Sequence, residues 1–149
     1  MTDNLDQSDE AVNKTQFAKQ FIQVIPHAVE LGMELIEIGD GKAEIDMPYD
    51  TRFVGDPETG VLHGGAVSAL MDTCCGAAAM SHPQATMGTA TIDLRIDYMR
   101  PATPGQTIRA NAICYHMTRS VAFVRATAVD DDDTRPVATA TGTFTVEGK

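Results

Sequence analysis

One aspartate stands in the middle of an apolar segment and is the residue of this chain that most needs a chemical explanation. Asp72 is the only charged residue of the run GGAVSALMDTCCGAAAMS at positions 64–81. A segment that is apolar or small on every side predicts a helix that is buried all round. Burial of an unpaired carboxylate is costly, and lone carboxylates in apolar surroundings gather at sites of acid–base chemistry. We therefore predict a functional role for Asp72, with a structural carboxylate that caps a neighbouring loop as the alternative.

The start of the same segment offers a second chemical group, the free N–H groups of a helix N-terminus. His63-Gly64-Gly65 follows a loop and opens the predicted helix, so backbone N–H groups without an intrahelical partner point outward there. The glycines allow a ligand oxygen to approach the backbone closely, and such an end binds an anion or polarises a carbonyl, as an oxyanion hole does. His-Gly-Gly alone also fits a plain tight turn. Together with a carboxylate eight residues later, it indicates a reactive site.

The elements that must hold these groups are predicted from the apolar periodicity. Residues 1–10 are expected to form a disordered tail, and apolar residues at helical spacing in 13–25 predict an amphipathic helix. Two alternating runs joined by Gly39-Asp40-Gly41 predict a hairpin, and a loop is expected to follow it. The predicted strands are 33–38, 43–47, 91–98, 107–117, 121–129 and 136–146, with Ile92, Leu94, Ile96 and Tyr98 on one face of the third.

Strands gathered into runs favour the α+β class over alternating strand–helix units. We expect a strongly curved antiparallel sheet wrapped around the helix at 64–81, with residues 11–149 forming one domain. The length of 149 residues and the mass of 16.0 kDa fit a single domain.

Composition and charge exclude several classes of protein. A net charge of −10 leaves no basic patch for nucleic acid, and no apolar run approaches the roughly 20 residues that span a bilayer. The cysteines lack paired CxxC spacing, and the adjacent Cys74 and Cys75 are read as core filler more readily than as nucleophiles. The acidic run 130–133 lacks the spaced ligands of a calcium loop, so a hairpin turn is predicted. We expect a reduced, cytoplasmic protein without a metal or a membrane partner.

The run GVLHGGAVSALMD at positions 60–72 resembles the signature of hotdog-fold acyl-CoA thioesterases of the phenylacetate-degradation type. The resemblance extends to YMRPA at 98–102 and GTF at 142–144, and it covers roughly residues 30 to 146. It implies the hotdog fold, in which a curved antiparallel sheet wraps a long helix and subunits form homodimers and commonly homotetramers. It also implies hydrolysis of an acyl-CoA thioester, with coenzyme A entering as part of the substrate and no separate cofactor.

The resemblance further implies roles for individual residues of the motif. The N–H of Gly64 would hold the thioester carbonyl oxygen, and Asp72 would act as general base on water or as nucleophile. Thr91 falls where related enzymes have a Ser or Thr that helps to position the water. His63 would orient the loop, and Gly65 is a substrate-binding candidate, as is Ser68 from the same motif.

The chain departs from the family pattern at Asp56, where some relatives have an Asn that touches the thioester. A second carboxylate near a developing oxyanion would repel it or would have to be protonated. Two arginines at strand ends, Arg100 and Arg119, are candidates for the phosphates of coenzyme A, with exposed turn residues as the equal alternative. The overall negative charge makes local positive charge necessary for such a ligand.

Two other functions remain open alongside hydrolysis. One is a non-catalytic acyl-CoA binding module on the same fold, although such a module has no need of Asp72. The other is a hotdog hydratase or dehydratase, for which Asp56 followed by His63 is a faint match. The small residues Ala77, Ala78 and Ala79 leave room for a medium-chain or aryl acyl group.

The spacing within the motif predicts that the site is shared between two subunits. Eight residues along a helix separate Gly64 from Asp72 by about 12 Å and turn them apart by roughly 80°. A base must lie within about 3 Å of the water that attacks the polarised carbonyl. Two such helices packed antiparallel about a two-fold axis bring each N-terminus to the other chain's Asp72.

Overall fold

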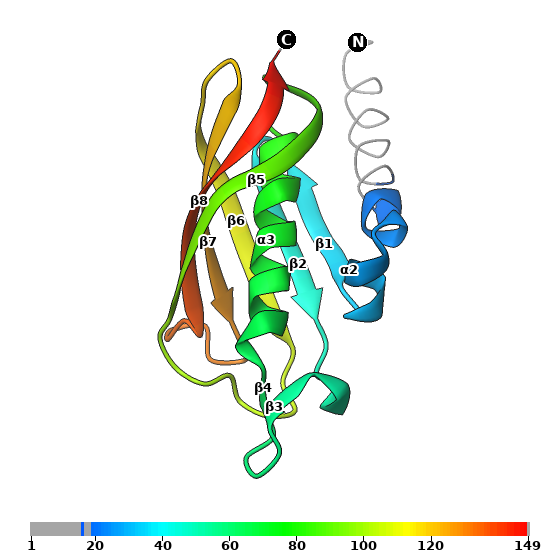
Figure 1. The fold of residues 1–149 in the computed structure, drawn as a ribbon, viewed down its shortest axis with the longest axis vertical. Coiled ribbons are helices and arrows are strands. Elements are labelled where there is room, and N and C mark those ends of the chain that lie inside the picture. The colour runs from blue at the N-terminus through cyan, green and yellow to red at the C-terminus, as the bar shows by residue number, and fades with distance from the viewer. Residues whose placement is uncertain (1–15, 17–18, 149) are drawn as a thin grey trace, which may run out of the picture.

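The computed structural model describes residue 16 and residues 19–148, which form a curved sheet around one long helix (Figure 1). Residues 19–24 are helical, whereas the expected tail and the start of the amphipathic helix lie outside the described residues. The helical elements that follow are α2 (Pro26–Glu30), the 3-10 turn η1 (Thr51–Phe53) and α3 (Gly64–Met80). The strands are β1 (Glu34–Gly39), β2 (Lys42–Met47), β3 (Val54–Asp56), β4 (Val61–Leu62), β5 (Ala85–Tyr98), β6 (Ile108–Met117), β7 (Val121–Val129) and β8 (Ala138–Gly148).

The main sheet has six strands in the order β1-β2-β6-β7-β8-β5, and every neighbouring pair is antiparallel. The helix α3 crosses the inner face of this sheet and contacts all six strands (Figure 1). Strands β1 and β5 are the two edges. The predicted α+β class and the sheet wrapped around the central helix are therefore confirmed.

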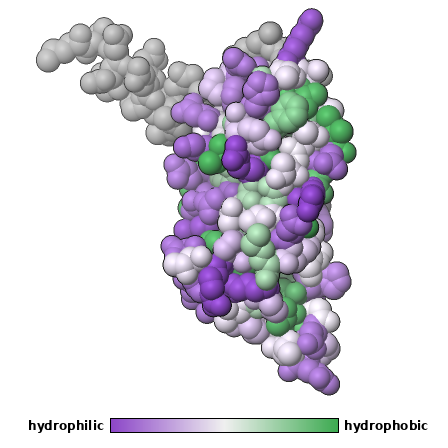
Figure 2. All heavy atoms as spheres, turned by 90° about the vertical axis from the view of Figure 1, so that its left-hand side faces the viewer, coloured by the Kyte–Doolittle hydropathy of each residue, from purple (hydrophilic) through white to green (hydrophobic). Residues whose placement is uncertain are grey.

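The core lies between α3 and the inner face of the sheet. Strand β6 shows how the sequence produces it, because Ile108, Ala110 and Ala112 are buried while the residues between them, Arg109 and Asn111, are exposed. Figure 2 views the molecule from the left-hand side of Figure 1 and shows hydrophilic side chains spread over that face, with hydrophobic ones in smaller groups between them. No helix in the described part of the chain is long and apolar enough to cross a bilayer.

The two adjacent cysteines belong to this core. The thiol of Cys74 donates weak hydrogen bonds of 3.4 Å to the carbonyl oxygens of Ala43 and Ala110. Burial raises the pKa of Cys74, and burial together with the negative charge of Asp72 raises the pKa of Cys75 to about 12. Thiols with such raised pKa values are poor nucleophiles at neutral pH, as expected for core filler.

The expectation that α3 is buried all round is wrong for one face of the helix. Gly65, Ser68, Ala69, Asp72 and Thr73 follow the spacing of one helical stripe, and none of them is buried. The sheet covers α3 from one side only, so this stripe has no cover among the described residues. Asp72 is accordingly half-buried rather than enclosed.

Strand β5 differs from the prediction in its length and in its alternation. It begins at Ala85, and its register against β8 shifts between Thr91 and Asp93. A bulge adds one residue and resets the alternation, so Ile92 is 56% exposed, contrary to the predicted face, and Thr91 turns its hydroxyl toward α3. The bulge requires Gly142 on β8, because a Cβ there would lie 2.7 Å from the carbonyl oxygen of Asp93.

Candidate active site

The first turn of α3 leaves one backbone N–H without a partner. His63 is the N-cap, and its Nδ1 accepts a hydrogen bond of 2.8 Å from the N–H of Gly65. The N–H of Ala66 donates to the carbonyl oxygen of His63. The N–H of Gly64 has no acceptor among the described residues. This N–H is therefore free to donate to a ligand oxygen, as the sequence motif predicts.

The cap also defines what His63 does. Its ring accepts at Nδ1 from the N–H of Gly65, which fixes the imidazole over the first turn of α3. Its backbone N–H donates to the carbonyl oxygen of Phe53 at 2.8 Å, which ties the helix start to η1. His63 thus contacts both the helix start and η1, and its orienting role stays a prediction.

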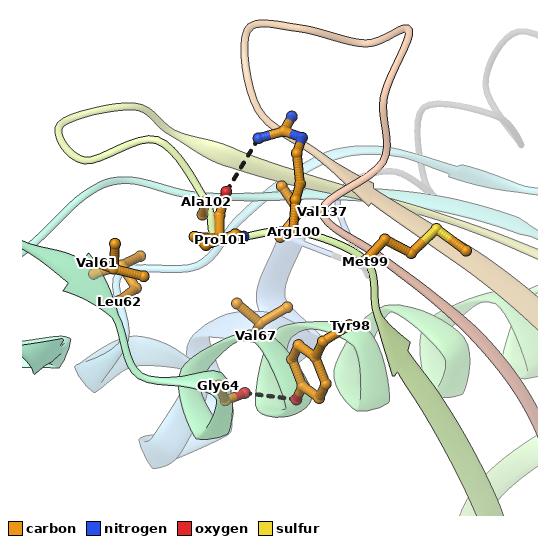
Figure 3. A pocket seen from close by; sticks show the side chains of 10 residues that line it. All are labelled: Val61, Leu62, Gly64, Val67, Tyr98, Met99, Arg100, Pro101, Ala102 and Val137. Atoms are coloured by element: carbon orange, nitrogen blue, oxygen red, sulfur yellow. Dashed lines mark hydrogen bonds between the residues drawn. The ribbon is translucent and has the colours of Figure 1, made fainter.

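A tyrosine that the sequence analysis did not include among the site residues lies against the same turn. The hydroxyl of Tyr98, at the end of β5, donates to the carbonyl oxygen of Gly64 at 2.8 Å and also contacts the hydroxyl of Ser68 (Figure 3). The Ser68 hydroxyl donates to the same carbonyl oxygen at 3.1 Å. The run YMRPA, which carries part of the family resemblance, was the available signal for this residue.

A groove of about 420 Å³ opens beside Gly64 and is walled mainly by apolar side chains (Figure 3). Its lining residues are Val61, Leu62, Gly64, Val67, Tyr98, Met99, Arg100, Pro101, Ala102 and Val137. Apolar walls around a small number of polar groups are typical of ligand sites. The groove therefore suits an extended ligand that has a carbonyl at the Gly64 end.

The carboxylate of Asp72 is held by one strand residue. The hydroxyl of Thr91 donates to Oδ1 of Asp72 at 2.7 Å, so the structure brings these two predicted residues together. The second oxygen, Oδ2, has no hydrogen-bond partner among the described residues. Asp72 thus has one oxygen held in position and one open on the uncovered stripe of α3.

Asp56 lies in the turn between β3 and β4 and is satisfied there. Its carboxylate accepts hydrogen bonds from the hydroxyl of Thr59 at 2.7 Å and from the N–H of Glu58 at 3.0 Å. These bonds lower the pKa of Asp56, with the Thr59 hydroxyl as the largest cause. Asp56 is therefore an ionised turn residue, and no hydrogen bond links it to the start of α3.

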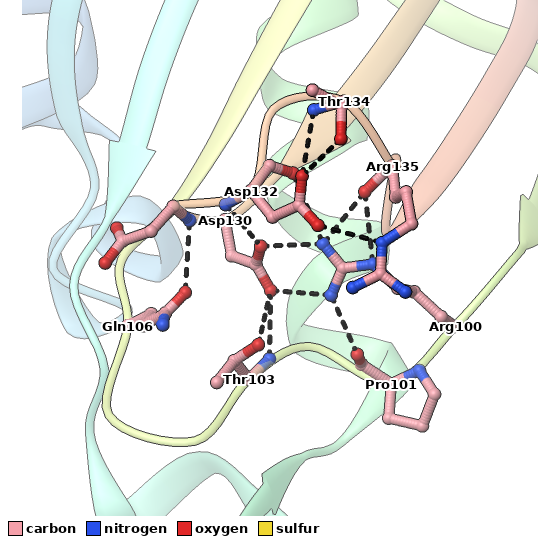
Figure 4. Close-up of polar contacts among 9 residues, drawn as sticks. Arg100, Pro101, Thr103, Gln106, Asp130, Asp132, Thr134 and Arg135 are labelled. Atoms are coloured by element: carbon pink, nitrogen blue, oxygen red, sulfur yellow. Dashed lines mark hydrogen bonds and ion pairs between the residues drawn. The ribbon is translucent and has the colours of Figure 1, made fainter.

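Arg100 lines the groove, but its guanidinium is occupied (Figure 4). Its two terminal nitrogens donate to the carboxylate of Asp130 at 2.6 and 2.7 Å, and other donors reach the carbonyl oxygen of Arg135. The side chain of Asp130 is fully buried, and the Arg100 guanidinium holds its pKa well below the usual range. The pair joins the 101–106 and 130–136 loops, so the structure gives Arg100 a structural role rather than a free cation for phosphates.

The remaining polar candidates lie apart from Gly64. Arg119 is in the turn between β6 and β7, at the opposite end of the sheet from β3 and β4, and has no carboxylate partner among the described residues (Figure 1). The acidic run 130–133 forms a turn, as predicted, in which Asp132 accepts from Thr134 and Arg135. The described residues contain no group of three or more His, Cys, Asp or Glu side chains able to hold a metal ion.

Comparison with known proteins agrees with this architecture. A protein of Halobacterium salinarum proposed to be an esterase is 33% identical over 117 residues, which cover 75% of this chain and 77% of that protein. The medium/long-chain acyl-CoA thioesterase YigI of Escherichia coli is 27% identical over 141 residues, which cover 86% of this chain and 90% of the enzyme. A crystal structure of a Pseudomonas aeruginosa protein matches with a TM-score of 0.79 and 36% identity, over 89% of this chain and 98% of that one. The family model of the thioesterase superfamily matches residues 59–137, and the chain therefore belongs to this superfamily and has its hotdog fold.

Proposed function

We propose that the protein hydrolyses acyl-CoA thioesters to the free acid and coenzyme A, as enzymes of the phenylacetate-degradation type do. The observation that carries the proposal is that one helix presents two groups. These are the N–H of Gly64, which has no acceptor among the described residues, and the carboxylate of Asp72, which Thr91 holds by one oxygen. These are the groups that addition of water to a thioester carbonyl needs, namely a donor for the oxyanion and a base for the water.

The reaction requires both groups at one carbonyl, and a second copy of the chain supplies this. The two residues lie two helical turns apart, about 12 Å, on the same helix. The uncovered stripe of α3 contains Asp72, and β5 is an open sheet edge beside it. An antiparallel α3 from a second copy covers the stripe, pairs the β5 edges and brings each Gly64 to the other copy's Asp72. The active unit is thus a homodimer, which assembles further into a homotetramer.

Each step then has an assigned group. The N–H of Gly64 donates to the thioester carbonyl oxygen and stabilises its negative charge as the tetrahedral intermediate forms. Asp72 takes a proton from water while the water oxygen adds to the carbonyl carbon. The C–S bond breaks, coenzyme A leaves as a thiolate that takes up this proton, and the acyl group leaves as the free acid. The alternative is direct attack by Asp72 on the thioester, which gives a mixed anhydride. Single turnover in ¹⁸O-water distinguishes the two routes, because only hydrolysis of the anhydride can place ¹⁸O in the carboxylate of Asp72.

The groove and the charges support a substrate class for this proposal. The walls beside Gly64 are apolar, which suits a medium-chain or aryl acyl thioester, and the relative YigI is named for medium and long chains. Arg119 is the candidate for a coenzyme A phosphate, because it has no carboxylate partner among the described residues and an antiparallel pairing carries its end of the sheet toward the other copy's Gly64. The proposal includes a single domain over 11–149, a cytoplasmic location and no cofactor beyond the coenzyme A of the substrate.

A panel of acyl-CoA thioesters assayed for free thiol tests this function, with Asp72→Asn as the matched inactive variant. Thiol release that disappears in the variant supports hydrolysis. Retention of acyl-CoA without thiol release would instead support a binding module. Loss of enoyl absorbance without thiol release would support a hydratase.

A further inference from the structure

The first turn of α3 begins with two glycines and is held in place by contacts from other parts of the chain. Glycine loses more conformational freedom on folding than any other residue, so a Gly-Gly helix start is intrinsically loose. A donor that stabilises a developing charge works best when it is already fixed before the substrate binds. The position of the Gly64 N–H must therefore be set by neighbours rather than by its own backbone preference.

Besides the Ser68 hydroxyl of the same helix, three hydrogen bonds hold the residues around Gly64. The N–H of His63 is fixed by Phe53, and the N–H of Gly65 is fixed by the His63 ring. The third is the hydroxyl of Tyr98, which reaches the carbonyl oxygen of Gly64 from the end of β5. The first two come from the segment that leads into the helix, whereas Tyr98 comes from a strand 34 residues later. It is the only one of the three that ties the helix start to the main sheet.

The ring of Tyr98 adds a steric contact to this hydrogen bond. A Cβ built on Gly64 would lie 3.4 to 3.6 Å from three atoms of the tyrosine, so the ring lies directly against the glycine. Tyr98 lines the groove (Figure 3), and the residue as a whole is 50% exposed. A ligand in the groove therefore meets the Tyr98 ring and the Gly64 backbone as one surface.

We propose that Tyr98 is a positioning residue that holds the Gly64 amide in the orientation needed to donate to the substrate carbonyl. The inference rests on the proposed thioester hydrolysis. This role differs from a general role in stability. Loss of the Tyr98 hydroxyl should weaken the binding of ligands that have a carbonyl beside Gly64 and leave the binding of ligands without one unchanged.

Two non-hydrolysable ligands separate these effects in calorimetric titration. One is the ketone in which a methylene replaces the sulfur of octanoyl-CoA, and the other is the thioether S-octyl-CoA, which has no carbonyl. One hydrogen bond to the carbonyl should make wild-type protein bind the ketone about five- to tenfold more tightly than the thioether. In Tyr98→Phe this ratio of the two Kd values should fall to within about twofold of one, with the Kd of the thioether unchanged. The kcat/KM for octanoyl-CoA should fall by at least about five- to tenfold, with a rise in KM, because the thioester carbonyl loses the same hydrogen bond as the ketone.

Tyr49→Phe is the matched control. The hydroxyl of Tyr49 donates to the carbonyl oxygen of Gly60 at 2.7 Å, so this variant also loses a tyrosine-to-glycine hydrogen bond, but not at the helix start. It should retain the wild-type ratio even if its Tm falls as far as that of Tyr98→Phe. Melting curves followed by circular dichroism establish that each variant is folded at the titration temperature.

The outcomes separate the two proposals. If the wild-type protein binds both ligands equally, the carbonyl site of the proposed function is wrong. If the wild-type protein discriminates and Tyr98→Phe discriminates equally well, the function stands and the role of Tyr98 is refuted. Should Tyr98→Phe not fold, Ser68→Ala removes the other hydroxyl on the same carbonyl oxygen. A lower ratio in that variant supports positioning through this oxygen, and an unchanged ratio overturns it.

Discussion

Replacing Gly64 by proline tests the central chemical assignment, because it deletes the N–H that would donate to the carbonyl, although it also adds ring atoms beside Tyr98. Proline at the first position of a helix is compatible with helical backbone, and its ring removes the hydrogen that would donate to the carbonyl. The preceding residue must be extended, and His63 already is, with φ −61° and ψ 136°. We therefore expect Gly64→Pro to fold and to melt at a temperature close to that of the wild-type protein.

The expected loss of activity follows from the single unpartnered N–H at this helix start. Removal of one oxyanion donor lowers kcat by about 10²–10³-fold, or roughly 2.7–4 kcal/mol in activation free energy. Gly64→Ala is the matched control, since it adds a Cβ in the same place but keeps the N–H. That Cβ would lie 3.4 Å from the Tyr98 ring, which is an ordinary van der Waals contact, so the alanine fits beside the tyrosine. We expect less than about a tenfold loss of kcat in this variant.

Thiol release from octanoyl-CoA, measured for both variants at equal folded concentration, gives the comparison. Equal rates for Gly64→Pro and Gly64→Ala would refute the role of the N–H. Mixing Gly64→Pro with Asp72→Ala then tests the shared site, because a mixed dimer has one site with both defects and one with neither. Random mixing should restore about a quarter of the wild-type sites. Inactive oligomers that are shown to be mixed would contradict the two-subunit arrangement.

Three further predictions follow from the described contacts. Asp72→Asn should lower kcat by about 10²–10⁴-fold in the thiol assay without a change in the melting curve, and near wild-type turnover would make Asp72 structural. Thr91→Val keeps the shape of the side chain but loses the hydrogen bond to Asp72, so kcat should fall about tenfold, and an unchanged rate would show that the bond does not orient the base. Arg100→Met should destabilise the fold by about 3–5 kcal/mol at pH 7 in urea unfolding, because the buried Asp130 carboxylate loses its cation and keeps only the donors of Thr103 and Asp132. Since the folded-state pKa of Asp130 is lowered, the stability from this pair is present above the unfolded pKa of about 3.9 and is lost as the pH falls below it, so the wild-type and Arg100→Met proteins should converge in stability toward pH 2.

The order of the elements could be predicted from the sequence because it depends on local periodicity. The helix expected at 64–81 is observed at Gly64–Met80, and the strand expected at 121–129 is observed with the same bounds. The hairpin of β3 and β4 was missed, since strands of three and two residues are defined by their pairing and not by an alternating pattern. The bulge in β5 was missed for a related reason, because an inserted residue breaks the alternation without changing the strand propensity.

The residues of the candidate site also fall into two groups, those that a local motif predicts and those that depend on contacts between distant parts of the chain. The motif that contains Gly64 and Asp72 is local, and the resemblance supplied Thr91, which the structure places against Asp72. The contact of Tyr98 with the helix start and the pairing of Arg100 with Asp130 join residues at least 30 positions apart. No local pattern specifies such contacts. As a result, Arg100 appeared available to a ligand when in the structure its donors are already used.

At Asp56, where some relatives have an Asn, local hydrogen bonds determine what the substitution does to the charge near the site. A carboxylate near a developing oxyanion was expected to repel it or to require a proton. In the structure the charge is retained and compensated within its own turn by Glu58 and Thr59, which lower the pKa of Asp56. The negative charge of Asp56 is stabilised by these donors, so Asp56 need not be protonated. Its oxygens accept from the hairpin and not from the start of α3. In the proposed reaction, stabilisation of the oxyanion therefore depends on the Gly64 N–H and on the neighbours that hold it.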